Sequence, residues 1–125
     1  MGLFTPARPD PMSLDTLRDA LRAFAAARDW EQFHSPKNLS MALSVEAAEL
    51  MEHFQWLTEA QSLALAPDAL GRVKEEIADV LLYLVRLSDR LDIDPLEAAR
   101  EKLAANEAKY PVEKARGTAR KYTEL

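Results

Sequence analysis

The 125-residue sequence predicts an all-α protein, most economically a bundle of four helices. Apolar residues recur three and four positions apart in four segments, which is the period of one helix face. Proline or a capping residue stands at the start of these segments. Asn-Gly and Asp-Gly, the strongest hairpin signals between alternating apolar runs, do not occur. These patterns favour helices throughout.

The first two predicted helices have clear starting signals. Ser13 is a suitable N-cap for a helix that reaches about Trp30, with a stripe formed by Leu14, Leu17, Leu21 and Phe24. Pro36 keeps the residue before it out of helical space, so this segment is broken there. A long helix is then expected over roughly residues 37–57.

Two further helices follow a weaker connection over residues 58–71, which is partly helical at most. Asp68 is the expected cap of the third helix, which ends near Leu91. Pro95 is the expected first residue of the fourth helix, because proline needs no amide partner there. This helix should end near Tyr110, just before the next proline.

The sequence divides into a proline-rich leader over 1–12, a helical domain over 13–110 and a basic tail over 111–125. The net charge of −5 argues against a bulk electrostatic grip on nucleic acid. The lack of cysteine excludes disulfides, cysteine-ligated zinc and thiol catalysis. The longest apolar run is too short to cross a membrane, and the N-terminus does not resemble a secretory signal. We therefore expect a cytoplasmic protein without nucleic-acid or membrane partners.

Acidic residues interrupt the apolar stripes of two helices. Glu46 falls in the middle of the second stripe, and Glu49 and His53 lie on its flank; the stripe is set by Leu39, Leu43, Leu50, Phe54 and Leu57. The third helix repeats this pattern. Two acidic pairs, each spaced i and i+3, are therefore predicted to face the bundle interior.

On the third helix Glu76 lies within the stripe set by Val73, Val80, Leu84, Leu87 and Leu91, with Asp79 and Tyr83 beside it. Glu75 points about 100° away, towards solvent. Four buried carboxylates repel one another unless protons, arginines or a multivalent cation offset their charge. The alternative is a solvated acidic face.

Neither Arg72 nor Arg86 sits on the stripe, which disfavours neutralisation by arginine. Carboxylate oxygens suit Mg²⁺, Mn²⁺ or Ca²⁺. A di-iron bundle would need Glu-x-x-His pairs, whereas His53 stands four residues after Glu49. The pattern therefore favours a hard divalent cation.

The acidic motifs resemble those of the all-α nucleoside triphosphate pyrophosphohydrolases of the MazG type: E-x-x-E at Glu46 and Glu49 and, after 26 intervening residues, E-x-x-D at Glu76 and Asp79. The segments "ARDWEQFHSPKNL", "EHFQWLT", "DVLLYLV", "KYP" and "RKYTEL" look like the dCTP pyrophosphatase branch of this family. The resemblance covers residues 13–125.

This resemblance implies Mg²⁺-dependent hydrolysis of a deoxynucleoside triphosphate, dCTP or a modified dCTP, to the monophosphate and pyrophosphate, with Mn²⁺ as a substitute. The implied catalytic metal ligands are Glu46, Glu49, Glu76 and Asp79. The family also assembles as homo-oligomers, so a tetramer or dimer is expected.

The same resemblance implies a substrate site: Trp30 and Trp56 around the base, and Lys102, Asn106 and Lys109 on the triphosphate, with Tyr83 and Tyr110 nearby. His34 and Asn38 are the candidates for hydrogen bonds to the base edge. Taken alone, a lone tryptophan more often packs in a core, and a loop histidine or a polar helix stripe is more often solvated. Leu21 stands where some members of the branch carry a histidine near the base.

Two alternatives stay open. One is a dUTP-type or broad-specificity pyrophosphatase. The other is a non-catalytic nucleotide-binding module of the same family. The intact set of four carboxylates favours an enzyme, because a binding module would be expected to have lost at least one ligand.

Overall fold

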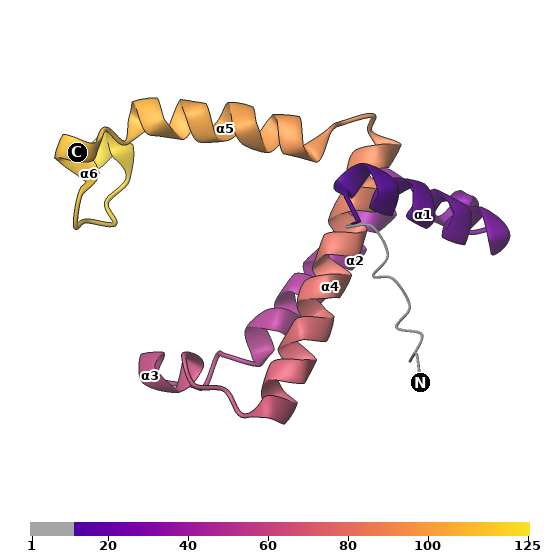
Figure 1. Ribbon diagram of the computed structural model, residues 1–125, viewed down its shortest axis with the longest axis horizontal. Coiled ribbons are helices and arrows are strands. Elements are labelled where there is room, and N and C mark those ends of the chain that lie inside the picture. Colours follow the sequence, from indigo (N-terminus) through magenta and orange to yellow (C-terminus); the bar gives the residue numbers. More distant parts are fainter. Residues whose placement is uncertain (1–11) are drawn as a thin grey trace, which may run out of the picture. The chain divides into compact units, whose positions relative to one another are not determined.

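The computed structural model describes residues 12–125, and this part of the chain consists of helices, turns and coil (Figure 1). The elements are α1 (Leu14–Ala27), a 3-10 helix (Glu31–Phe33), α2 (Pro36–Glu52), α3 (Glu59–Ser62), α4 (Pro67–Arg90), α5 (Pro95–Lys109), α6 (Val112–Ala115) and a second 3-10 helix (Tyr122–Glu124). The all-helical class is confirmed. The predicted leader lies, apart from Met12, outside the described residues.

Helix α1 begins where the sequence predicts. The Thr16 amide donates to Ser13 Oγ at 3.1 Å, and the Ser13 amide donates to Thr16 Oγ1 at 2.8 Å. This capping box satisfies amides that would otherwise be unpaired at the helix start. The predicted N-cap at Ser13 is therefore confirmed.

Helix α2 also starts as predicted but ends earlier, at Glu52 rather than near Leu57. The His53 and Phe54 amides donate to carbonyls three residues back, at 3.3 and 2.9 Å, so the helix closes into tight turns. Thr58 then caps the separate short helix α3, whose place the sequence indicated only as a partly helical connection.

Helix α4 is the longest element, and its predicted cap is wrong. The N-cap is Ala66, without a side-chain hydrogen bond, and Pro67 opens the helix. Asp68 lies inside the first turn, where it pairs with Arg72 at 3.8 Å. Proline at the first position supplies a helix-compatible φ, so a side-chain cap is not needed to fix the start.

The first compact unit runs to Asp92, and its main packing joins α2 to α4, which lie side by side in Figure 1; α1 also contacts α4. Its buried hydrophobic residues are Ala25, Leu39, Val73 and Val85. Many large apolar side chains on the outer faces of α2 and α4 stay exposed. The single chain therefore buries only a thin core.

The second unit covers residues 93–125. Asp94 caps α5 by accepting from the amides of Leu96 and Glu97 at 3.0 and 3.2 Å. The segment predicted as a tail contains α6 and the second 3-10 helix. No helix within residues 12–125 combines the length and apolar character needed to cross a membrane.

Candidate active site

Three carboxylates meet between α2 and α4. Glu46 and Glu49 come from α2, and Glu76 comes from α4. One carboxylate oxygen of each lies within 4.8 Å of the other two. This carboxylate cluster forms because both acidic pairs sit on the faces with which α2 and α4 pack together, as the apolar stripes predicted.

Among residues 12–125, no positive charge compensates the carboxylate cluster. Glu46 Oε2 and Glu76 Oε2 are buried and, among the described residues, have no hydrogen-bond partner. The pKa of Glu46 is raised to about 7. The main cause is the neighbouring Glu76 carboxyl, and burial and the Glu49 carboxyl raise this pKa further. Buried, unpaired acceptors of this kind fit a cation bound by oxygen ligands.

In the described part of the chain, arginine does not neutralise the cluster. Arg72 pairs with Asp68, as described above, and Arg86 pairs instead with Asp89, at 3.4 Å. Arg86 lies off the apolar stripe, as the sequence predicts, but its side chain is nevertheless buried, being only 5% exposed. The face of α4 that meets α1 is buried as well, and a single apolar stripe did not reveal this second face.

Asp79 and Glu75 occupy different places around the same helix. Asp79 is not one of the three residues whose oxygens gather within 4.8 Å, but its charge helps to raise the pKa of Glu46, so it lies beside the cluster. Glu75 is exposed, as predicted. Asp79 also lines an adjoining cavity.

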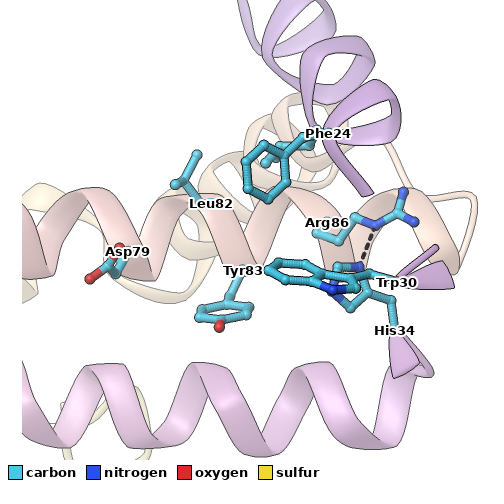
Figure 2. A pocket seen from close by; sticks show the side chains of 8 residues that line it. Phe24, Trp30, His34, Asp79, Leu82, Tyr83 and Arg86 are labelled. Carbon is cyan, nitrogen blue, oxygen red and sulfur yellow. Dashed lines mark hydrogen bonds between the residues drawn. The ribbon is translucent and has the colours of Figure 1, made fainter. Parts of the chain in front are cut away.

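This cavity has a volume of about 250 Å³ and an apolar lining with a few polar groups: Leu21, Phe24, Trp30, His34, Asp79, Leu82, Tyr83 and Arg86. Figure 2 shows Phe24 on α1 above α4, with Tyr83 pointing from α4 towards α2 and Trp30 close to His34. Small-molecule sites typically measure about 300–1,000 Å³. The cavity is therefore suited to part of a small ligand, such as a single ring.

A left-handed turn places Trp30 in the cavity wall. Asp29 has φ of 53°, and the Trp30 amide donates back to the Ala25 carbonyl at 2.9 Å, which closes α1 with a Schellman motif. The Trp30 ring meets Phe24 and His34 edge to face, with centroids 5.6 and 6.1 Å apart. Because Trp30 remains 42% exposed, part of its ring is free to contact a ligand.

His34 is held by two arginines of α4. Arg86 Nε donates to His34 Nδ1 at 3.1 Å, and Arg90 Nε donates to the His34 carbonyl at 3.1 Å. Burial, and then the charges of Arg86 and Arg90, lower the pKa of His34. His34 is consequently neutral at pH 7.

Asp89 anchors this arrangement to α1. Arg22 binds both oxygens of Asp89, with Nε to Oδ2 at 2.7 Å. This pairing is the main cause that lowers the pKa of Asp89. This network could not be predicted from the sequence, since its members come from two helices and a loop far apart in the chain.

Two of the predicted base-site residues lie elsewhere. Trp56 is 87% exposed and follows the C-terminal end of α2, whereas Trp30 precedes its N-terminal end. The 17 residues of α2 span about 25 Å, so one chain does not bring both rings around one base. Asn38 donates to the Phe33 carbonyl at 3.1 Å and does not line the cavity.

The predicted triphosphate residues belong to the second unit. Lys102, Asn106 and Lys109 follow one face of α5. Lys109 Nζ lies 4.9 Å from the centroid of the Tyr122 ring, which Tyr110 meets edge to face at 6.0 Å. Their substrate role stays a prediction.

The sequence missed several residues of the cavity. Phe24 was read only as part of a core stripe, and Leu82 and Arg86 were not expected to face a ligand. A search for a second buried face on α4, one that includes Val85 and Ser88, would have found Leu82 and Arg86.

Comparisons with known proteins agree with the geometry. The MazG-like family matches residues 41–125. The chain is 44% identical to dCTP pyrophosphatase 1 of Rattus norvegicus and also of Homo sapiens, each over 119 residues, or 94% of this chain and 69% of the relative. A crystal structure of a pyrophosphatase from Archaeoglobus fulgidus aligns with a TM-score of 0.75 and 42% identity, and covers 83% of this chain and 97% of that one.

Proposed function

The chain belongs to the MazG-like family, and we propose that it hydrolyses dCTP, and modified dCTP, to dCMP and pyrophosphate as a cytoplasmic enzyme of nucleotide-pool maintenance. The relatives named dCTP pyrophosphatase 1, whose likeness extends over 94% of this chain, support the substrate. The carboxylate cluster supports the reaction.

The observation that carries this proposal is the convergence of Glu46, Glu49 and Glu76 within 4.8 Å, with two buried oxygens that have no partner in the described part of the chain. Gathering buried acids in this way lowers the stability of the fold, so stability does not explain the cluster. All the donors are hard carboxylate oxygens, which fit Mg²⁺, with Mn²⁺ as a substitute. Asp79, beside the cluster, is the proposed fourth ligand.

Each part of the site has a distinct task in this proposal. A bound Mg²⁺ would offset the charge of the triphosphate, polarise the α-phosphoryl group and acidify a water molecule. Glu46 or Glu49 would accept the proton of the attacking water. Trp30 and Tyr83 would hold the base in the cavity, and Lys102, Asn106 and Lys109 would bind phosphate oxygens.

The direct test follows the phosphorus products of dCTP with and without MgCl₂ by ³¹P NMR, across a panel of deoxynucleoside and ribonucleoside triphosphates. We expect dCMP and pyrophosphate, strict metal dependence and the highest kcat/KM for dCTP. Orthophosphate as the first product would contradict the proposal. A preference for dUTP, equal rates for all bases, or binding without turnover would each point to one of the alternatives.

We also propose that a second copy covers the outer face of the α2–α4 pair and completes a four-helix bundle, in a dimer or tetramer. Met41 and Val45, one turn apart on α2, are 60 and 55% exposed. On α4, Ile77, Leu81 and Leu84 are 53, 39 and 42% exposed. These residues are spaced as helix faces that pack against other helices. A second copy is also the route by which Trp56 could reach a base.

Light scattering at micromolar concentration tests this assembly. The wild type is expected to be a dimer or tetramer. Ile77→Glu is expected to shift it to monomers, because assembly would bury an unpaired charge in the packing face. A monomeric wild type would contradict the proposal. Glu75→Lys, which alters an exposed position on the same helix, serves as the control.

A further inference from the structure

Arg86 is buried in the wall of the cavity, although nothing in the metal chemistry requires it there. The residue is only 4% exposed, and its Nη2 atom is buried without a hydrogen-bond partner among the described residues. A buried guanidinium with an unpaired nitrogen is costly and is weak evidence for a stabilising role. Its other nitrogens act on two specific neighbours.

Through one of these contacts Arg86 decides which nitrogen of His34 carries the proton. Arginine has only donors, so the 3.1 Å bond from Arg86 Nε requires His34 Nδ1 to be the acceptor. The single proton of the neutral ring is therefore on Nε2. Within residues 12–125, Nε2 of His34 has no hydrogen-bond partner of its own.

The position of the His34 ring is fixed from both sides. Arg90 holds the backbone carbonyl of His34 at 3.1 Å, and the Trp30 ring packs against the imidazole edge to face. Asp89 forms a salt bridge with Arg86 and also accepts a hydrogen bond from Arg22 of α1. His34 also lines the cavity in which a ligand would lie.

We propose that Arg86 is a positioning residue that fixes His34 as an Nε2–H donor towards the base, and that this donor makes the cavity prefer cytosine to uracil or thymine. This inference rests on the proposed function, from which it takes the class of ligand. It adds a residue that sets specificity through His34 without touching the reacting atoms.

The preference follows from the chemistry of the base edge. The N3 atom of cytosine accepts a hydrogen bond, whereas N3 of uracil and thymine carries a proton. An N–H donor facing N3 pairs with cytosine, but leaves two donors opposed and unpaired with uracil. Sites that hydrogen-bond a ligand reject an analogue that cannot complete the bond more strongly than apolar pockets do.

Nitrogen-15 NMR of metal-free protein tests the tautomer without any need for activity. The chain has only two histidines, so His53→Gln assigns the signals. Wild type and Arg86→Lys, which keeps a side chain that only donates, are expected to show a protonated Nε2 and a bare Nδ1. Arg86→Met is expected to show a mixture of tautomers. A protonated Nδ1 in the wild type, or an unchanged ring in Arg86→Met, would overturn the inference.

Titration of the same samples with dCMP and dUMP, without metal, tests the preference. We expect Arg86→Met to weaken dCMP binding about tenfold and dUMP binding little, while Arg86→Lys recovers most of the loss. Arg100→Met, which removes an exposed arginine paired only with Glu97, is the matched control. Equal weakening for both nucleotides would overturn the proposed choice of cytosine.

Steady-state kinetics separate this inference from the function on which it rests. With dCTP and Mg²⁺, Arg86→Met is expected to raise KM about tenfold and leave kcat within about threefold, because base binding is shared by ground and transition states. A wild type inactive on every triphosphate would refute the proposed function, while the tautomer and dCMP binding would still decide the role of Arg86.

Discussion

The carboxylate cluster and the adjoining cavity share helix α4, but they satisfy their polar groups in opposite ways. The cluster brings three acids together and leaves buried oxygens on Glu46 and Glu76 unpaired. Around the cavity, His34 is paired with Arg86 and Asp89 with Arg22, and Arg86 Nη2 is the one buried side-chain atom there without a partner among the described residues. The unpaired carboxylates favour the binding of a cation, whereas the side chains paired with arginine are held in fixed positions. The first region is suited to chemistry and the second to recognition.

Removal of one acid from the cluster is the change with the largest expected effect. Glu46→Gln keeps the size of the side chain but removes an anionic ligand, so dCTP turnover should fall more than about 100-fold, beyond what loss of a supporting residue around a metal costs. The measurement is kcat with saturating Mg²⁺. Turnover within a few-fold of wild type would place the metal site elsewhere.

The same variant has a pH signature without metal. The pKa of Glu46 is raised to about 7, so its ionisation in the folded state is opposed and the metal-free protein loses stability as pH rises from about 4.5 to 7. Glu46→Gln should therefore melt higher than wild type at pH 8 and equally at pH 4. A lower melting temperature at pH 8 would contradict the unpaired state of the cluster.

Helix periodicity made the cluster predictable, whereas the cavity depended on features without a period. Glu46, Glu49 and Glu76 were found because they interrupt regular apolar stripes. Trp30 was assigned to a base site only through family resemblance, and its place in the cavity wall depends on a left-handed turn at Asp29. The network from Arg22 to His34 joins residues that only the folded chain brings together.

Loss of the Trp30 ring tests whether the cavity recognises the base. Stacking on an aromatic side chain contributes about 1–3 kcal/mol per base, so Trp30→Ala should raise KM for dCTP about tenfold or more while kcat changes little. Steady-state kinetics give both constants. Trp56→Ala should do the same only in an assembled oligomer. If Trp30→Ala left KM unchanged, Trp30 would be a packing residue.

A smaller effect is expected from the turn that precedes Trp30. Asp29→Val places a β-branched residue at φ of 53°, which costs about 1–2 kcal/mol or displaces the turn. Asp29→Gly accepts the same backbone and is the matched control. We expect a lower melting temperature and weaker dCMP binding for the valine variant alone. Similar behaviour of the two variants would show that the turn does not position the cavity wall.

Neighbouring glutamates of α4 provide the most direct test of the metal site. Glu76 lies in the cluster with one oxygen buried, and Glu75 is exposed on the same helix. Mg²⁺-dependent hydrolysis of dCTP should collapse in Glu76→Gln and stay within a few-fold of wild type in Glu75→Gln, since an exposed helix charge is worth about 0.3–0.5 kcal/mol. Equal losses in both variants, or an inactive Glu75→Gln beside an active Glu76→Gln, would contradict the proposed site.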